Sequence, residues 1–334
     1  MDEKWVAITG CNGYIGGQTV LKFKDMGYKV IGVDRSNASP WIRSRVDLFV
    51  PGDFSNPMFI KYIIDNNPEA LIHIAGTSLV GPSVTDPGPY YYNNVGNTAR
   101  MLADLAKGGW KRTVVYSSSA AIYGNPTGAV VSEDSDTLPI SPYGHSKLMA
   151  EQVLRDCANG YGFKTIAFRY FNACGGDSKV RHGQLKQATH LIARVIESII
   201  NKSIFTLNGT NYKTPDGTCV RDYLHVEDIA NAHYLAVAYA KTMSENSNEF
   251  NLGTGRGTSI KEIIAAVEHI TGQTVLTHLG SRREGDPATL VASAYLFKKE
   301  AGWNPDASNI NNIVRTAWDW YQSVILPVEY KNRA

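Results

Sequence analysis

Short apolar runs alternate with helix-like stretches through the first half of the chain. The apolar runs cover residues 5–9, 28–33, 70–74, 113–116 and 165–168, each about the length of a strand. Apolar residues at helical spacing lie between them, in residues 14–26, 59–66, 94–106 and 146–159. Strands that alternate with helices predict an α/β fold built on a doubly wound parallel sheet of the Rossmann type.

The pattern changes after residue 175. Residues 175–187 are rich in Gly, Lys, His and Gln and predict a loop. Further helices are expected at residues 188–201, 227–242, 259–271 and 309–323. No Pro/Gly/Ser linker separates the two halves. We therefore expect residues 1–175 to form one part, and residues 176–334 to form a smaller α/β part that packs directly on it and is interleaved with it.

Composition and charge exclude several classes of protein. The chain has 334 residues, with 33 Lys+Arg against 31 Asp+Glu, and no run of five basic residues, which argues against nucleic-acid binding by bulk charge. No apolar stretch of about 18 residues predicts a membrane span, and the N-terminus lacks the pattern of a secretory signal. The four cysteines are scattered without a C-x-x-C pair, so we expect no disulfide framework, no metal site and a cytoplasmic location.

Three glycines follow the first apolar run. Gly10, Gly13 and Gly16 have the spacing G-x-x-G-x-x-G between a predicted strand and a predicted helix. Glycine permits a positive φ and a close approach of the backbone to a pyrophosphate, and the helix N-terminus then directs free N–H groups at the phosphates. The same spacing also occurs in ordinary tight turns, so it indicates dinucleotide binding only in this context.

Two acidic residues follow later strands. Asp34 ends the second strand, where a carboxylate can accept both hydroxyls of an adenosine ribose and repel a 2′-phosphate. The alternative is a strand-end Asp that caps a loop. Arg35 beside it could hold a 2′-phosphate, but we favour NAD over NADP. Asp53 could accept the adenine amino group, although by itself it is typical of a turn.

A candidate base lies near the middle of the chain. Tyr143 and Lys147 are one helical turn apart, and a nearby ammonium stabilises phenolate, which would lower the pKa of the tyrosine. A second such pair, Tyr295 and Lys299, lies far from any nucleotide motif and is interpreted as a solvated helix face. Ser119 distinguishes the first pair, because it follows a predicted parallel strand at the edge where ligands bind.

Together these motifs are familiar. The chain resembles the extended short-chain dehydrogenase/reductases, and within them the UDP-glucose 4-epimerases. The matching stretches are TGCNGYIG, LIHIAG, VGPSVTDP, YYYNNV, SSSAAIYG, SPYGHSKLMAEQ, RYFNACG, TPDGTCVRDYLHV and RREGDP. They cover nearly the whole length, and several are long and rare.

The resemblance implies an isomerase of carbohydrate and galactose metabolism. Its expected reaction is the NAD-dependent 4-epimerisation of a UDP-sugar, most simply UDP-glucose and UDP-galactose, through a transient 4-keto intermediate. NAD would be tightly bound and regenerated in each turnover. Residues 1–175 would bind NAD and residues 176–334 mainly the UDP-sugar. A cytoplasmic homodimer is implied, formed through the helices at 94–106 and 146–159, with no nucleic-acid or membrane partner.

The resemblance also implies roles for individual residues. The catalytic residues would be Ser119, Tyr143 and Lys147. The NAD-binding residues would be Gly10, Gly13, Tyr14, Ile15, Gly16, Asp34, Asp53, Phe54, Ala75, Gly76, Asn94, Ser117, Tyr143, Lys147 and Tyr170. The substrate-binding residues would be Ser119, Tyr143, Asn172, Arg221, Arg283, Asp286 and Leu290. The two arginines can pair with a diphosphate, although either alone could form a surface ion pair.

Some positions depart from the family pattern. Ser78 replaces a lysine near the cofactor, Asn208 replaces an aromatic residue expected to stack on uracil, and Ser293 replaces an acid. Leu290 stands where a bulky tyrosine often restricts the sugar, and is either a pocket residue or one more core residue.

Other activities remain as alternatives. One is a 4-epimerase of UDP-N-acetylglucosamine or of the pair UDP-xylose and UDP-arabinose. A nucleotide-sugar 4,6-dehydratase would need an Asp-Glu pair where this chain reads SSSAAIYG. A net oxidoreductase that releases its cofactor, and a non-catalytic NAD sensor, are the remaining readings. The intact set of serine, tyrosine and lysine argues against the sensor.

Overall fold

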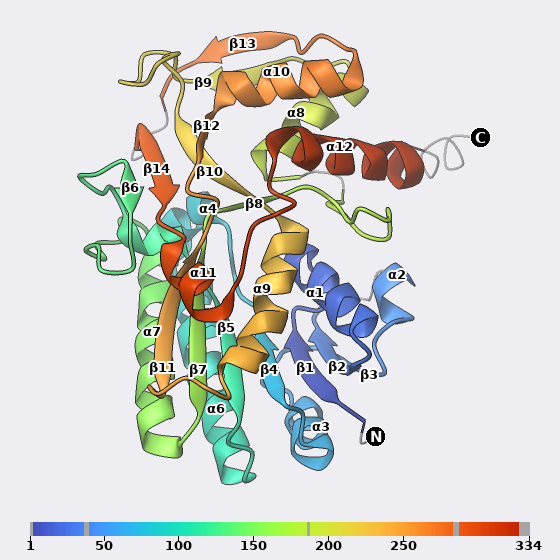
Figure 1. Cartoon of the computed structure of the whole chain (residues 1–334), viewed down its shortest axis with the longest axis vertical. Coiled ribbons are helices and arrows are strands. Elements are labelled where there is room, and N and C mark those ends of the chain that lie inside the picture. The colour runs from blue at the N-terminus through green and yellow to red at the C-terminus, as the bar shows by residue number, and fades with distance from the viewer. Residues whose placement is uncertain (1–2, 37–39, 186–187, 283–286, 327–334) are drawn as a thin grey trace.

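Seven parallel strands form the central sheet of the protein (Figure 1). The structure is a computed structural model and describes residues 3–36, 40–185, 188–282 and 287–326. In spatial order the strands are β11 (Ser247–Leu252), β7 (Lys164–Tyr170), β5 (Thr113–Ser119), β4 (Ala70–His73), β1 (Trp5–Thr9), β2 (Lys29–Asp34) and β3 (Leu48–Pro51). The order reverses between β1 and β4, which confirms the Rossmann-type fold.

Helices cover both faces of this sheet because successive side chains of a buried strand point to opposite faces. Val6 and Ile8 of β1 pack on one side, and Ala7 between them packs on the other. The first face is covered by α1 (Tyr14–Asp25), α9 (Val226–Tyr239) and α11 (Tyr295–Ala301). The second face is covered by α3 (Pro57–Asn66), α6 (Thr98–Lys107) and α7 (Pro142–Tyr161). Two apolar cores therefore sandwich the sheet.

Most of the chain beyond residue 175 forms a second, smaller part with a core of its own. Its sheet contains β12 (Gly257–Ser259), β10 (Val220–His225), β14 (Thr289–Ala292) and β6 (Val130–Val131), with β8 (Asn172–Cys174) also paired to β10. A two-stranded sheet joins β13 (Thr277–Gly280) to β9 (Phe205–Asn208). The helices are α8 (Leu191–Ile200), α10 (Ile260–Thr271) and α12 (Ile310–Trp320). Because β11 and α9 belong to the first layer, both parts of the chain contribute to the central sheet and its cover.

The remaining elements are short. They are α2 (Pro40–Arg43), α4 (Val80–Thr85), α5 (Gly88–Tyr91), the π-helices η1 (Tyr92–Asn97) and η3 (Tyr321–Ile325), and the 3₁₀-helix η2 (Ala120–Tyr123). Residues 175–185 contain no helix or strand, as the composition of that loop predicts. Within the described ranges, no helix has the length and apolar character needed to cross a membrane.

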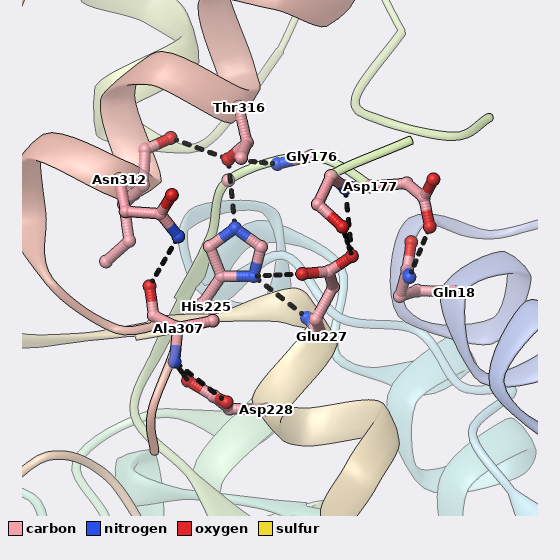
Figure 2. Close-up of polar contacts among 12 residues, drawn as sticks. Gln18, Gly176, Asp177, His225, Glu227, Asp228, Ala307, Asn312 and Thr316 are labelled. Atoms are coloured by element: carbon pink, nitrogen blue, oxygen red, sulfur yellow. Dashed lines mark hydrogen bonds and ion pairs between the residues drawn. The ribbon is translucent and has the colours of Figure 1, made fainter. Parts of the chain in front are cut away.

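A polar network connects this loop to both parts (Figure 2). The buried Asp177 carboxylate accepts a hydrogen bond from Gln18 Nε2 of α1 at 3.0 Å. The N–H of Gly176 donates to Thr316 Oγ1 of α12 at 3.1 Å, and that hydroxyl also lies 2.9 Å from His225 Nε2. The loop therefore joins α1, whose first turn faces the site described below, to the helices of the second part.

Candidate active site

A cavity of about 530 Å³ opens at the carboxyl ends of the central strands. It lies where the strand order reverses, which is the usual ligand site of such sheets. The predicted site residues that line it are Gly10, Gly13, Tyr14, Ile15, Gly16, Asp34, Phe54, Ala75, Gly76, Ser117, Ser119, Tyr143, Lys147, Tyr170 and Asn172. Its volume is in the range of pockets that bind cofactors and small molecules.

The glycine motif forms a close turn between β1 and α1. Gly10 has a φ of +68°, and a Cβ on Gly16 would lie 1.9 Å from the Gly10 carbonyl oxygen. The N-cap residue of α1 is Gly13, which has no side chain to accept from the first N–H groups of the helix. A bare backbone cradle at a helix N-terminus fits the pyrophosphate of a dinucleotide.

The end of β2 supplies a carboxylate to the same cavity. Asp34 Oδ2 accepts from the N–H of Asn12 at 3.0 Å, and Oδ1 accepts from the N–H of Ser36 at 2.9 Å. Both bonds fix the carboxylate beside the glycine turn, in reach of a ribose bound there. Asp53 is not among the residues that line the cavity, but it forms an ion pair with Arg35, which is one of them.

The candidate base begins α7. Ser141 accepts from the N–H of Gly144 at 3.1 Å and Pro142 occupies the first turn, which sets the start of this helix. Tyr143 and Lys147 are both buried, and Lys147 Nζ lies 5.9 Å from the centre of the Tyr143 ring. The structure therefore brings the phenol and the ammonium to one wall of the cavity, with Ser119 at the end of β5.

The ionisation of this pair differs from the sequence expectation. Burial raises the pKa of the Tyr143 phenol, and its hydrogen bond with Ser119 acts in the opposite direction. Burial also lowers the pKa of Lys147 to about 7, against the attraction of Glu151. In the protein alone, desolvation outweighs the stabilisation of phenolate that the one-turn spacing predicts. Lys147 Nζ instead donates to the Ser117 carbonyl oxygen at 2.7 Å.

Asn94 lies behind the wall of the cavity. Its Oδ1 accepts from the N–H of Thr77 at 2.8 Å, and its Nδ2 donates to Ser146 Oγ at 2.9 Å. These bonds fasten the loop after β4, which contains Ala75 and Gly76, to the helix of the candidate base. Asn94 therefore holds two parts of the cavity wall together, the loop after β4 and helix α7.

The structure describes some of the residues that were predicted to bind the substrate. Asn172 lines the cavity and donates through Nδ2 to the Asp222 carbonyl oxygen at 2.9 Å. Arg221 on β10 pairs in register with Leu290 on β14, outside the cavity lining. Leu290 packs on a small core cluster that includes Phe171, and Phe171 also lines the cavity. Arg283 and Asp286 lie outside the described residues.

The remaining sequence observations have simple placements. Ser78 lines the cavity, Asn208 lies in β9, and the N–H of Ser293 donates to the Val131 carbonyl oxygen at 2.7 Å. Tyr295 is 67% exposed and Lys299 lies on the same short helix, as expected for a solvated face. In the part of the chain that the structure describes, no three His, Cys, Asp or Glu side chains are arranged to hold a metal ion.

Sequence reasoning missed a buried histidine behind the cavity. Ser117 Oγ donates to the Tyr170 hydroxyl at 2.8 Å, and that hydroxyl lies 2.5 Å from His233 Nε2 of α9. Burial lowers the pKa of His233 to about 3, so the ring stays neutral at ordinary pH. The hydrogen bonds connect two lining residues to a helix of the sheet cover. No motif marks this histidine in the sequence, because the contact joins elements far apart in the chain.

Replacing Tyr170 by phenylalanine is expected to destabilise the fold by about 1–3 kcal/mol, because Ser117 and His233 each lose a buried partner. Urea unfolding of the two proteins measures the difference. The exposed Tyr295→Phe is the matched control and should change the free energy of unfolding by less than about 0.5 kcal/mol. Equal effects of the two substitutions would contradict the hydrogen-bonded chain.

Comparison with known proteins agrees with this geometry. Residues 6–253 match the NAD dependent epimerase/dehydratase family. A UDP-glucose 4-epimerase from Azospirillum brasilense is 38% identical over 325 residues, which cover 96% of this chain and 92% of that protein. The crystal structure of UDP-glucose 4-epimerase from Brucella ovis in complex with NAD has 38% identity and a TM-score of 0.88, covering 94% of this chain and 97% of that one.

A second solved structure has a similar fold. It is a UDP-glucose-4-epimerase from Stenotrophomonas maltophila with bound NAD and formylated UDP-arabinopyranose. Its identity to this chain is 31% and its TM-score is 0.90, with 97% of this chain and 100% of that chain covered. The likeness thus extends through both parts of the fold and not only through the dinucleotide-binding half. The three proteins compared above are UDP-glucose 4-epimerases that match nearly the whole length of the chain, and the chain belongs to the NAD dependent epimerase/dehydratase family.

Proposed function

We propose that this chain is an isomerase that inverts carbon 4 of a UDP-sugar and interconverts UDP-glucose and UDP-galactose with bound NAD. The observation that carries the proposal is the position of Ser119, Tyr143 and Lys147 on the wall of the cavity that also contains the glycine cradle. A base beside a dinucleotide site is what reversible oxidation of an alcohol requires. The names of the relatives support the sugar nucleotide as substrate.

The residues of the cavity fit NAD. The tight turn of Gly10, Gly13 and Gly16 would hold the pyrophosphate; a Cβ on Gly10 would meet the backbone of Ala75, and one on Gly16 would meet the carbonyl oxygen of Gly10. Asp34 would accept hydrogen bonds from the adenosine ribose hydroxyls, and Lys147 would donate to the hydroxyls of the nicotinamide ribose. Bound NAD supplies a hydride acceptor that returns the hydride in the same turnover, so it can remain in place as a prosthetic group.

The side chains of this chain move and hold the proton of the 4-hydroxyl. Tyr143 removes it as a general base when its side chain is the phenolate, and Ser119 assists through a hydrogen bond to the same oxygen. Tyr143 returns the proton when the 4-keto sugar is reduced from its other face. The sugar must turn between these steps, and anchoring through the diphosphate leaves it free to do so. Arg221 and Arg283 are the proposed anchors, and Asn172 and Asp286 are proposed as further substrate-binding residues.

The activity is tested by incubating the purified protein with UDP-galactose and no added NAD. NMR should show UDP-glucose accumulating to a constant ratio with UDP-galactose, because the cofactor is regenerated. A 4-keto-6-deoxy product would instead indicate a dehydratase, which residues 117–124 argue against because they contain no carboxylate. Conversion that depends on added NAD in equal amount would indicate a net oxidoreductase.

Leu290 is the proposed limit on the size of the sugar. Leu290→Ser should raise the ratio of kcat/KM for UDP-N-acetylglucosamine over UDP-glucose by roughly 10- to 200-fold, since it removes a steric wall worth about 1–3 kcal/mol. In this structure Leu290 packs on the core cluster that includes Phe171, and it is Phe171 that lines the cavity. Steady-state kinetics with both substrates measure the ratio. An unchanged ratio would assign Leu290 to the core cluster alone.

The assembly and location are also proposals. Val84, Tyr92 and Met149 expose 66%, 66% and 47% of their surfaces on α4, η1 and α7, and α4 and η1 each pack against α7. An exposed apolar surface on these helices supports a homodimer formed there. Light scattering should give twice the mass of the chain, and Tyr92→Asp should lower it. The free thiols of all four cysteines support a reducing, cytoplasmic environment.

A further inference from the structure

The arginine next to the ribose carboxylate is held by two acceptors. Arg35 Nε donates to Asp53 Oδ2 at 3.0 Å, and Nη2 of the same guanidinium pairs with that oxygen as well. Nη2 also donates to Asn93 Oδ1 at 2.6 Å. Arg35 and Asn93 both line the cavity at the end that contains Asp34. The guanidinium that lines the cavity next to Asp34 is therefore already engaged by the protein.

Both acceptors are fixed by other bonds. Asp53 Oδ1 accepts from the N–H and the hydroxyl of Ser55 at 2.9 and 2.8 Å. Burial of Asp53 acts against its charge, but the hydrogen bonds from Ser55 and Arg35 prevail and lower the pKa of Asp53. Asn93 is buried, and its Nδ2 donates to Thr77 Oγ1 at 3.0 Å, which directs Oδ1 at the guanidinium. The carboxylate thus stays charged and in place.

This arrangement affects the choice between NAD and NADP. An arginine at this position of a dinucleotide site can accommodate the 2′-phosphate of NADP. To do so here, Arg35 would have to leave a charge-assisted pair with Asp53 and a hydrogen bond with Asn93. We propose that Asp53 is a determinant of cofactor specificity that acts through Arg35, by withholding the guanidinium from a 2′-phosphate. The inference rests on the proposed placement of NAD, and adds to the repulsion by Asp34.

The test is a comparison of four proteins: the wild type, Asp53→Asn, Arg35→Met and the double variant. Each is equilibrated with equal concentrations of NAD and NADP, and the bound nucleotides are released by denaturation and quantified by mass spectrometry. Asp53→Asn should raise the NADP-to-NAD ratio by about tenfold, because it frees Arg35. In the Arg35→Met background the same substitution should change the ratio by less than about twofold.

The cycle separates the possible outcomes. If Asp53→Asn raised the NADP-to-NAD ratio equally in the wild-type and the Arg35→Met backgrounds, Asp53 would repel the phosphate directly. If it raised the ratio in neither background, Arg35 would not be restrained by Asp53. Either result would overturn the inference. Asn93→Ala removes the other acceptor of Arg35 and should raise the NADP-to-NAD ratio by about two- to threefold. This variant tests the same restraint if Asp53→Asn does not fold. Asp34→Asn checks the placement of NAD itself: an unchanged ratio there would contradict the proposed cofactor site and not the restraint on Arg35.

Discussion

Replacement of Tyr143 by phenylalanine should lower kcat by about 100- to 10,000-fold, because it removes the general base and keeps the ring. The residue is buried on the wall of the cavity and hydrogen-bonded to Ser119. Binding of UDP-galactose should change far less than turnover, since the hydroxyl is needed mainly for proton transfer. Initial rates of UDP-glucose formation measure the loss.

Tyr295→Phe is the control for this substitution. It removes the same hydroxyl from the other tyrosine that precedes a lysine by four positions, whose side chain is exposed on α11. Its kcat should equal that of the wild type. If Tyr143→Phe retained more than about a tenth of wild-type turnover, the assignment of the base would be wrong.

The second large effect concerns a buried ion pair beneath the site. Arg169 of β7 donates through Nε and Nη2 to the two oxygens of Glu151 on α7, at 3.1 and 2.9 Å. The Glu151 side chain is fully buried and that of Arg169 is 6% exposed. Arg169→Met keeps the length of the side chain but leaves a buried carboxylate without its cation. The free energy of unfolding should fall by about 3–5 kcal/mol, as measured by urea denaturation.

Lys61→Met supplies the comparison for a surface pair. Lys61 and Asp65 form an ion pair along α3, and their side chains are 69% and 48% exposed. Loss of this ion pair should lower the free energy of unfolding by no more than about 0.5 kcal/mol. Losses of similar size for the two variants would mean that the Glu151 carboxylate is satisfied without Arg169.

Much of the fold could be predicted from periodicity, and the misses have physical causes. The strands buried on both faces are continuous apolar runs, so β1, β2, β4, β5 and β7 were predictable within a few residues. The edge strand β11 reads SNEFNL, where polar residues precede the buried end, and apolar runs do not reveal it. The helix expected at 94–106 begins as the π-helix η1, a distinction that depends on hydrogen-bond register rather than on side-chain pattern.

The site was predictable only where its residues share a motif. Gly10, Asp34 and Tyr143 lie in local patterns, and the structure brings all three to one cavity. The contacts of Arg35 with Asp53, and of Tyr170 with His233, join different strands and helices, so spacing along the chain does not reveal them. The raised pKa of Tyr143 also follows from burial, which only the packed fold determines.

The central claim is that the hydrogen on carbon 4 leaves and returns to the same carbon inside the protein. The most direct measurement uses UDP-glucose with deuterium at carbon 4, incubated with the protein in ordinary water. Our account predicts that the UDP-galactose formed carries deuterium at carbon 4, because a hydride held by the bound cofactor does not exchange with solvent. Product with hydrogen from the solvent at that carbon would contradict it.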